Sequence, residues 1–164
     1  NYDLYLITVG KLCDSSKEII NIQESLKIAS VNYFSLIPWI LKIVTPSRLN
    51  LKSRLWIFSS VAADLGRPSN YQYGAAKSGI TTFCEGLLHK CNKKPFSIRI
   101  IKAGFLSTRM SEGKAPKVLS ASTSSLAKNL LKNPNKRGIE YYPWWWGAIM
   151  FLIKKLPSSL ISKL

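Results

Sequence analysis

The sequence predicts an α/β fold, in which a parallel β-sheet is covered by helices on both faces. Two observations support this prediction. Short apolar runs that suit buried strands alternate along the chain with longer segments of helical periodicity. The 164 residues are also 46 % hydrophobic, so the chain can bury the core of one domain.

Four apolar runs are predicted to form the strands. The first is "YDLYLITVG" at 2–10, which ends in a glycine, and the second is "RLWIFSS" at 54–60. The third is "FSIRIIKAG" at 96–104, and the fourth is "RGIEYYP" at 137–143, which is ended by its proline. Since helical segments separate successive runs, the strands are expected to pair in parallel.

Three segments between and after these runs are predicted to be helices. Residues 15–44 repeat apolar side chains at helical spacing, and Pro38 is expected to kink this helix. The candidates to cap its first turn are Asp14, Ser15 and Ser16. The other helices are 72–91 and 124–133, and the predicted polar loops are 64–70 and 110–122.

The chain divides into a predicted catalytic domain at 1–143 and an apolar, basic tail at 144–164. The tail begins with three tryptophans, a residue that favours the lipid–water boundary. The apolar run of the tail, residues 144–153, is too short to span a bilayer, because a transmembrane helix needs about 20 residues. Lysines follow, so peripheral contact with a membrane surface is one expectation for the tail. The alternative is that it folds over a substrate pocket.

The composition limits the classes of partner. The formal net charge is +16, which suits an anionic partner but also an ordinary lysine-rich surface, which we favour. Nucleic acid is not expected, because the aromatics cluster in "YYPWWW" while the lysines lie elsewhere. Three cysteines and one histidine show no metal-ligand spacing, so no metal is expected, and a reduced, cytoplasmic protein fits best.

The segment "SNYQYGAAKSG" at 69–79 places Tyr73 four residues before Lys77. On a helix the two side chains share a face, and an ammonium near a phenol lowers the tyrosine pKa from its usual value of about 10. Such a pair alone is more often an exposed helix pair. Ser60, however, ends a predicted strand thirteen residues earlier. Ligands of doubly wound sheets bind beyond the carboxyl ends of the strands, so all three groups are expected in one crevice.

The run "IFSSVAADLGRPSNYQYGAAKSGI" resembles the active-site segment of the short-chain dehydrogenase/reductase family. That family has a strand, Ser-Ser, about a dozen residues and then Tyr-x-x-x-Lys. "SVNYFS" resembles its helix with an active-site Asn, and "IRIIKAGFLSTRM" resembles its strand and loop that read Pro-Gly-x-Val-x-Thr. The resemblance runs from about residue 4 to 110. It implies a doubly wound, Rossmann-like sheet and hydride transfer between NAD or NADP and a carbonyl or secondary alcohol.

The resemblance also implies a role for each catalytic candidate. Tyr73 would exchange a proton with the reacting oxygen, and Lys77 would hold the nicotinamide ribose and lower the pKa of Tyr73. Ser60 would donate a hydrogen bond to the reacting oxygen, and Asn32 would hold a water that links Lys77 to solvent. The alternative for Asn32 is an amide on the helix surface.

The candidate cofactor-binding residues are Gly10, Tyr73, Lys77, Gly104, Leu106 and Thr108, again by resemblance. The backbone at Gly104 and Leu106 would hold the carboxamide, and Thr108 would reach the pyrophosphate or the carboxamide. A threonine in a loop is also often a local cap, and that alternative stays open for Thr108.

The sequence departs from the family pattern at three places. The family's Asn-Asn-Ala-Gly is Ile7-Thr8-Val9-Gly10 here, and Ala103 replaces a proline. No glycine-rich phosphate-binding turn exists, because the nine glycines are never closer than the five positions between Gly74 and Gly79. We therefore interpret the chain as the C-terminal two-thirds of such an enzyme, with the N-terminal part and its glycine-rich turn missing.

Within the family, the chain is similar to a subgroup that reduces lipid-linked keto-pentoses, the reductase subunit of the decaprenylphosphoryl-ribose 2-epimerase. "GFLSTRM" and the tail carry this similarity, which implies a lipid-linked carbonyl substrate at the inner membrane surface. Two alternatives are a non-catalytic remnant and a membrane-surface binding module. A homo-oligomer would be built on a helix pair lined by Phe83, Leu87 and Leu88, unless these side chains face the sheet.

Overall fold

A computed structural model describes residues 2–12, 22–45, 53–92, 96–111 and 116–162. Its main sheet has four parallel strands in the order β1-β2-β3-β6. The strands are β1 (Leu4–Ile7), β2 (Arg54–Ser60), β3 (Ser97–Ala103) and β6 (Gly138–Tyr142). All four predicted strands therefore form, and their carboxyl ends lie at one edge of the sheet.

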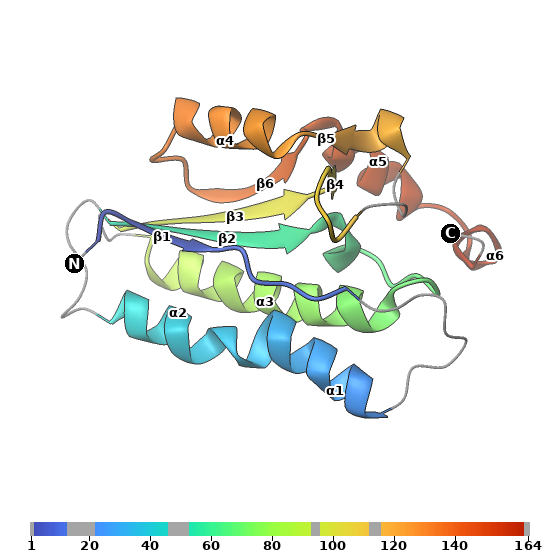
Figure 1. Ribbon diagram of the computed structural model, residues 1–164, viewed down its shortest axis with the longest axis horizontal. Coiled ribbons are helices and arrows are strands. Elements are labelled where there is room, and N and C mark those ends of the chain that lie inside the picture. The colour runs from blue at the N-terminus through green and yellow to red at the C-terminus, as the bar shows by residue number, and fades with distance from the viewer. Residues whose placement is uncertain (1, 13–21, 46–52, 93–95, 112–115, 163–164) are drawn as a thin grey trace.

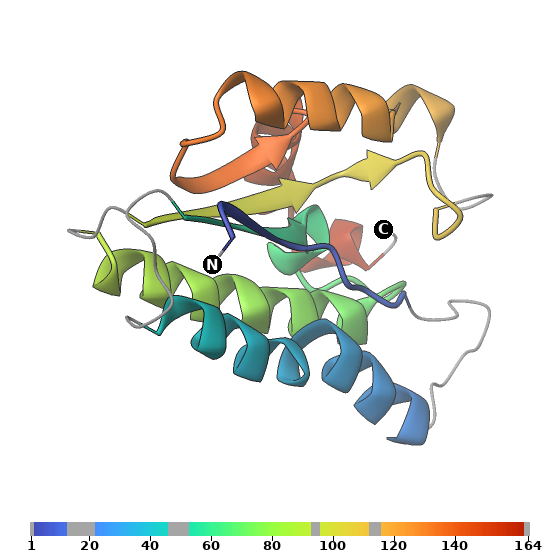
Figure 2. The ribbon, with the colours of Figure 1, turned by 60° about the vertical axis from the view of Figure 1, so that its left-hand side comes forward.

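Helices cover both faces of this sheet, which confirms the predicted fold class (Figure 1). One face carries α1 (Ile22–Ala29), α2 (Leu36–Val44) and α3 (Tyr71–Lys90). The other face carries α4 (Thr123–Lys132), as Figure 2 also shows. The last two helices, α5 (Trp145–Ile153) and α6 (Ser158–Ile161), lie beyond the carboxyl ends of the strands.

Each face of the sheet carries an apolar core, and a third apolar cluster joins Val61 to Trp146 and Met150 of α5. Under α1 to α3, the core includes Ile40, Ile57, Ile80 and Ile100, none of them exposed. Phe83, Leu87 and Leu88 are partly buried and pack against the same core. On the α4 face, the core includes Trp56, Ile101, Leu126, Leu130 and Tyr142.

The first long helix departs from its prediction. Its interruption is not at Pro38 but at a π-helical turn, Ser30–Phe34, where the N–H of Ser35 donates to the carbonyl of Ser30. Pro38 is the third residue of α2, in the first turn of that helix, whose N–H groups lack intrahelical partners. Proline therefore costs nothing there. The predicted caps at 14–16 lie outside the described residues.

Two other boundaries also differ. The strand predicted at 2–10 ends at Ile7, because the chain beyond it bonds to side chains of neighbouring helices instead of to a strand. The polar loop predicted at 110–122 contains a 3₁₀ turn, Lys117–Leu119, and β5 (Ser120–Ala121). That short strand pairs in parallel with β4 (Phe105–Leu106).

One described stretch, Ile22–Val44, has the length and apolar composition of a membrane-crossing helix. Within its most apolar 18-residue window, 22 % is buried inside the protein. Its inward side chains Ile28, Leu36 and Ile40 are 0–5 % exposed and pack on the rest of the protein. One helix that passes this test by length and composition is weak evidence for a membrane span.

A buried arginine joins α4 to the sheet. Arg99, in β3, is 1 % exposed and its Nε donates to the Glu140 carboxylate of β6. Its Nη1 donates to the carbonyls of Leu130 and Asn133, at the end of α4, where helix carbonyls lack intrahelical partners. This arginine thus holds α4 against the sheet, and α4 forms one wall of a cavity at the carboxyl ends of the strands.

Candidate active site

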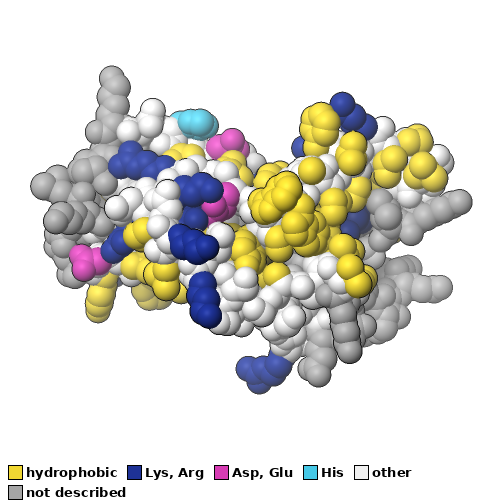
Figure 3. Space-filling view, turned by 90° about the horizontal axis from the view of Figure 1, so that it is seen from above, with side chains coloured by type: hydrophobic (Ala, Val, Ile, Leu, Met, Phe, Trp, Pro, Cys, Tyr) yellow, Lys and Arg dark blue, Asp and Glu magenta, His cyan; other side chains and the backbone are white. Residues whose placement is uncertain are grey.

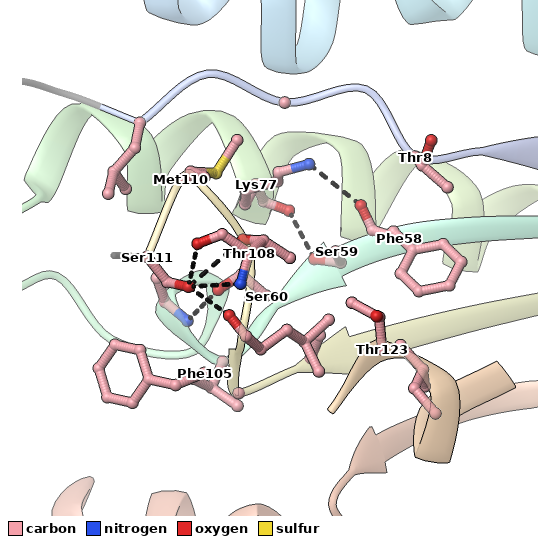
Figure 4. Close-up of a pocket in the computed structure, with 18 of the residues that line it drawn as sticks. Thr8, Phe58, Ser59, Ser60, Lys77, Phe105, Thr108, Met110, Ser111 and Thr123 are labelled. Carbon is pink, nitrogen blue, oxygen red and sulfur yellow. Dashed lines mark hydrogen bonds between the residues drawn. The ribbon is translucent and has the colours of Figure 1, made fainter. Parts of the chain in front are cut away.

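A cavity of about 1050 Å³ opens at the carboxyl ends of the strands. Figure 4 shows it between α3, the ends of β2 and β3, and the segment that carries Phe105 to Ser111. It is lined by nearly all of the predicted site residues, namely Gly10, Ser60, Tyr73, Lys77, Gly104, Leu106 and Thr108. Asn32 does not line it. The structure thus brings together groups up to about a hundred positions apart in the sequence.

Lys77 is the central cation of this site. Its Nζ donates to the carbonyls of Val9 (3.2 Å) and Phe58 (3.0 Å) and lies 5.9 Å from the centre of the Tyr73 ring. The residue is 3 % exposed, and burial lowers the pKa of Lys77 to about 8. The buried ammonium therefore gives up its proton more readily than an exposed lysine does.

Asn32 lies behind Lys77 and is fully buried. Its Oδ1 accepts from the N–H of Lys11, and its Nδ2 donates to the carbonyls of Lys11 and Ile28. It is therefore not a surface amide. Gly10 packs between the two groups, because a Cβ there would lie 3.3 Å from Asn32 Oδ1 and 3.5 Å from Lys77 Nζ. Asn32 thus holds the segment beside Lys77 in place.

Ser60 ends β2 and caps the 3₁₀ turn Val61–Ala63, since its Oγ accepts from the N–H of Ala62. The small residues early in α3 explain how Tyr73 comes close to this turn. A Cβ on Gly74 would lie 2.8 Å from the carbonyl oxygen of Ala62, so only glycine allows the helix to approach.

The neighbouring Ser59 joins the same strand to α3. Its hydroxyl is 2.6 Å from Thr81 Oγ1 and 3.4 Å from the carbonyl of Lys77, both in α3. Thr81 Oγ1 also donates to that carbonyl. Both serines line the cavity, but Ser59 bonds to α3 while Ser60 caps the turn after β2. The sequence motif alone does not show this division.

The candidate cofactor residues after β3 have local partners. The N–H of Gly104 donates to the carbonyl of Tyr142, so this N–H is not available to a ligand. Thr108 donates its N–H to Ser111 Oγ, and its hydroxyl is 3.3 Å from the same atom. Ser111 Oγ also bonds to the Leu106 carbonyl (Figure 4). The alternative of a local turn at Thr108 is thus favoured by geometry.

Sequence reasoning missed two sets of groups around the site. The indole of Trp146, in α5, lies over Gly104 and lines the cavity. The four-residue spacing of Trp146 and Met150, both buried, was the signal that this face of α5 points inward. The second set is Asp64, whose carboxylate bonds to Lys102 and to the Tyr141 hydroxyl and so ties the Ser60 turn to β3 and β6.

Comparisons with known proteins agree with the fold. No protein-family model matches the chain. It is 26 % identical over 153 residues to an uncharacterized oxidoreductase of Mycobacterium tuberculosis, an alignment that covers 93 % of this chain and 61 % of that protein. The chain therefore spans about three fifths of the length of this curated relative.

Several solved structures have the same fold as this chain. A short chain dehydrogenase from Burkholderia cenocepacia in complex with NADP superimposes with a TM-score of 0.78 at 16 % identity, covering 96 % of this chain and 68 % of that one. A 3-oxoacyl-[acyl-carrier protein] reductase with bound NAD from Brucella melitensis gives 0.68 at 17 % identity, covering 84 % and 59 %. An angucycline C-6 ketoreductase with bound NADP gives 0.69 at 11 % identity, covering 85 % and 59 %. These similarities establish the Rossmann-like fold.

Proposed function

We propose that this chain forms the catalytic part of an NAD(P)-dependent oxidoreductase of the short-chain dehydrogenase/reductase type. The observation that carries the proposal is one cavity, at the carboxyl ends of parallel strands, lined by Ser60, Tyr73 and Lys77. Neighbours of the same fold hold NADP or NAD, and a relative is named an oxidoreductase. The reaction would be hydride transfer between nicotinamide and a carbonyl or secondary alcohol.

The side chains of the cavity suit the proton-transfer half of this reaction. Tyr73 would donate the proton that the reduced oxygen takes up, and the Lys77 ammonium would stabilise the phenolate that remains. Ser60 Oγ is the acceptor in its bond with the Ala62 N–H, so its O–H can donate to the reacting oxygen. When bound, the dinucleotide supplies the hydride.

The residues present fit the nicotinamide end of such a cofactor. Gly10 lines the cavity beside Lys77, where a Cβ would lie 3.5 Å from Nζ, and its lack of a side chain keeps this wall of the cavity small. Lys77, Tyr73 and the Gly104 carbonyl would then hold the ribose and the carboxamide. The pyrophosphate has no glycine-rich turn in these 164 residues.

The test is a hydride-transfer assay on an extended enzyme, meaning this chain preceded by a segment that carries a glycine-rich turn. We expect it to oxidise NADH or NADPH in the presence of a ketone from a varied panel. The unextended chain is the control and should bind either dinucleotide more weakly than micromolar. If the extended enzyme binds the dinucleotide but reduces no ketone and oxidises no secondary alcohol, the chain is a non-catalytic relative.

We also propose that the substrate is carried on a lipid and that α5 and α6 contact a membrane surface. Trp144, Phe151 and Leu152 are 80 %, 61 % and 64 % exposed, and Lys154 and Lys155 follow them. Figure 3 shows hydrophobic side chains gathered on the half of the molecule toward α5 and α6. Trp146, on the inward face of α5, lines the cavity, so a lipid-linked substrate would enter beside the bilayer.

Co-sedimentation with anionic phosphatidylglycerol vesicles tests this contact. The double variant Phe151→Ser/Leu152→Ser should bind about tenfold more weakly, because two side chains that would be buried in lipid are lost. Ile22→Ser removes a similarly exposed side chain from α1 and should have no effect. Equal sedimentation of the wild type and the double variant would show that α5 does not contact lipid.

A further inference from the structure

The short turn Val61–Ala63 lies between the strand that ends in Ser60 and the helix that carries Tyr73. Ser60 holds the start of this turn, since its Oγ accepts from the N–H of Ala62. The first turn of α3 packs closely on it, because a Cβ on Gly74, the neighbour of Tyr73, would lie 2.8 Å from the Ala62 carbonyl oxygen. A displacement of the turn would therefore change the position of Ser60 relative to Tyr73.

Asp64 holds the opposite end of the turn. Its N–H donates to the carbonyl of Val61, 3.2 Å away, and its side chain is 3 % exposed. Its Oδ1 accepts from the Lys102 ammonium of β3, and its Oδ2 accepts from the Tyr141 hydroxyl of β6 at 2.7 Å. Both carboxylate oxygens are thus engaged, and Asp64 does not line the cavity. Any effect of Asp64 on the reaction must therefore act through the turn.

The two partners of Asp64 are themselves held in place. Lys102 and Tyr141 are paired positions of neighbouring strands, and Lys102 Nζ lies 5.5 Å from the centre of the Tyr141 ring. A Cβ on Gly147 of α5 would lie 3.1 Å from Tyr141 Cδ2, so the ring also packs against that helix. Burial and the bond to Asp64 raise the pKa of Tyr141, so its hydroxyl keeps the proton that it donates. The carboxylate thus ties the turn to two strands of the sheet.

We propose that Asp64 is a positioning residue, which through Lys102 and Tyr141 holds Ser60 at the distance from Tyr73 that proton transfer requires. The inference rests on the proposed function, to which it adds a residue outside the cavity. A buried carboxylate is a stiff anchor, because the loss of either bond leaves a buried polar group unsatisfied. Stiffness matters here, since a misplacement of about 1 Å at a reacting group can cost about 100-fold in rate.

Turnover of the extended enzyme tests the proposal. Asp64→Asn keeps the size of the side chain but removes the counter-charge of Lys102, so kcat should fall about tenfold or more. The KM for the dinucleotide should change less than about twofold, because Asp64 does not line the cavity. Adding Lys102→Met to Asp64→Asn removes the unpaired charge, while the asparagine can still accept from Tyr141. This double variant should recover part of the lost kcat.

The Ser60→Ala background separates positioning from a general loss of structure. If Asp64 acts by placing Ser60 Oγ, Asp64→Asn should lower kcat less than about threefold in a chain that lacks this hydroxyl. Glu140→Gln is the control for lost stability, because it breaks the buried ion pair with Arg99. Glu140 precedes Tyr141 in β6, so its side chain points to the opposite face of the sheet. Its replacement should lower Tm but change kcat less than about twofold.

Hydrogen exchange on the 164-residue chain gives a second readout that needs no turnover. The Ala62 N–H bonds to Ser60 Oγ, so Asp64→Asn should speed its exchange about tenfold or more relative to the core amides of β3. Glu140→Gln should not change this ratio. An unchanged ratio in Asp64→Asn would overturn the proposal, and so would an unchanged kcat or a loss that simply adds to that of Ser60→Ala. An inactive extended wild type would refute the hydride-transfer proposal, whereas exchange would still decide whether Asp64 holds Ser60 in place.

Discussion

Replacement of Tyr73 by phenylalanine should lower the turnover of the extended enzyme by about 10²–10⁴-fold, the range attributed to a positioned acid–base group. The ring of Tyr73 lies 5.9 Å from Lys77 Nζ and lines the cavity. Phenylalanine keeps this ring and removes only the hydroxyl. The binding of the dinucleotide should therefore change much less than turnover, which steady-state kinetics and calorimetry can separate.

Tyr71→Phe is the matched control for this experiment. Tyr71 begins the same helix, two residues earlier, but it is 50 % exposed and does not line the cavity. Removing its hydroxyl should leave turnover unchanged. Turnover of Tyr73→Phe within about threefold of the wild type would exclude Tyr73 as the acid–base group.

The parts of the site that the sequence could predict are those set by local geometry. Tyr73 and Lys77 share a helix face because they are four residues apart, and the length of "RLWIFSS" places Ser60 at the end of its strand. The parallel sheet also follows from local patterns, since each apolar run is separated from the next by a helical segment.

The parts that could not be predicted depend on contacts between distant residues. The carbonyl of Val9 bonds to Lys77, 68 positions away, and the Asp64 carboxylate bonds to Tyr141, 77 positions away. Contacts between residues so far apart leave no periodic pattern in any short stretch of the sequence, so the sequence alone does not predict them. The interruption of the first helix was misplaced for a related reason. Proline is a strong local signal, but the π turn at Ser30–Phe34 orients Asn32 toward Lys11, a tertiary requirement.

Gly104→Ala should lower the free energy of unfolding by about 3 kcal/mol, at the upper end of the range for overpacking a core. A Cβ at this position would lie 1.9 Å from Trp146 Nε1 and 2.3 Å from its Cδ1, so the indole must move. The ring is 5 % exposed and packs on Phe105 and Trp145, with ring centres 5.7 and 5.2 Å away. The indole must therefore displace these rings or turn into the cavity that it lines, where it loses their contacts. Chemical denaturation measures the change.

A double-mutant cycle with Trp146→Ala assigns this loss to the contact. Trp146→Ala removes the ring, so Gly104→Ala should cost little in that background, and the coupling free energy should approach about 3 kcal/mol. Gly86→Ala, in α3, is the control for a change of backbone entropy, because its Cβ would meet nothing within 4 Å. It should stabilise the helix by about 0.5–1 kcal/mol. If Gly104→Ala costs the same with and without Trp146, the indole does not lie on Gly104. In that case α5 does not form this wall of the cavity, and a path for substrate beside α5 loses its structural basis.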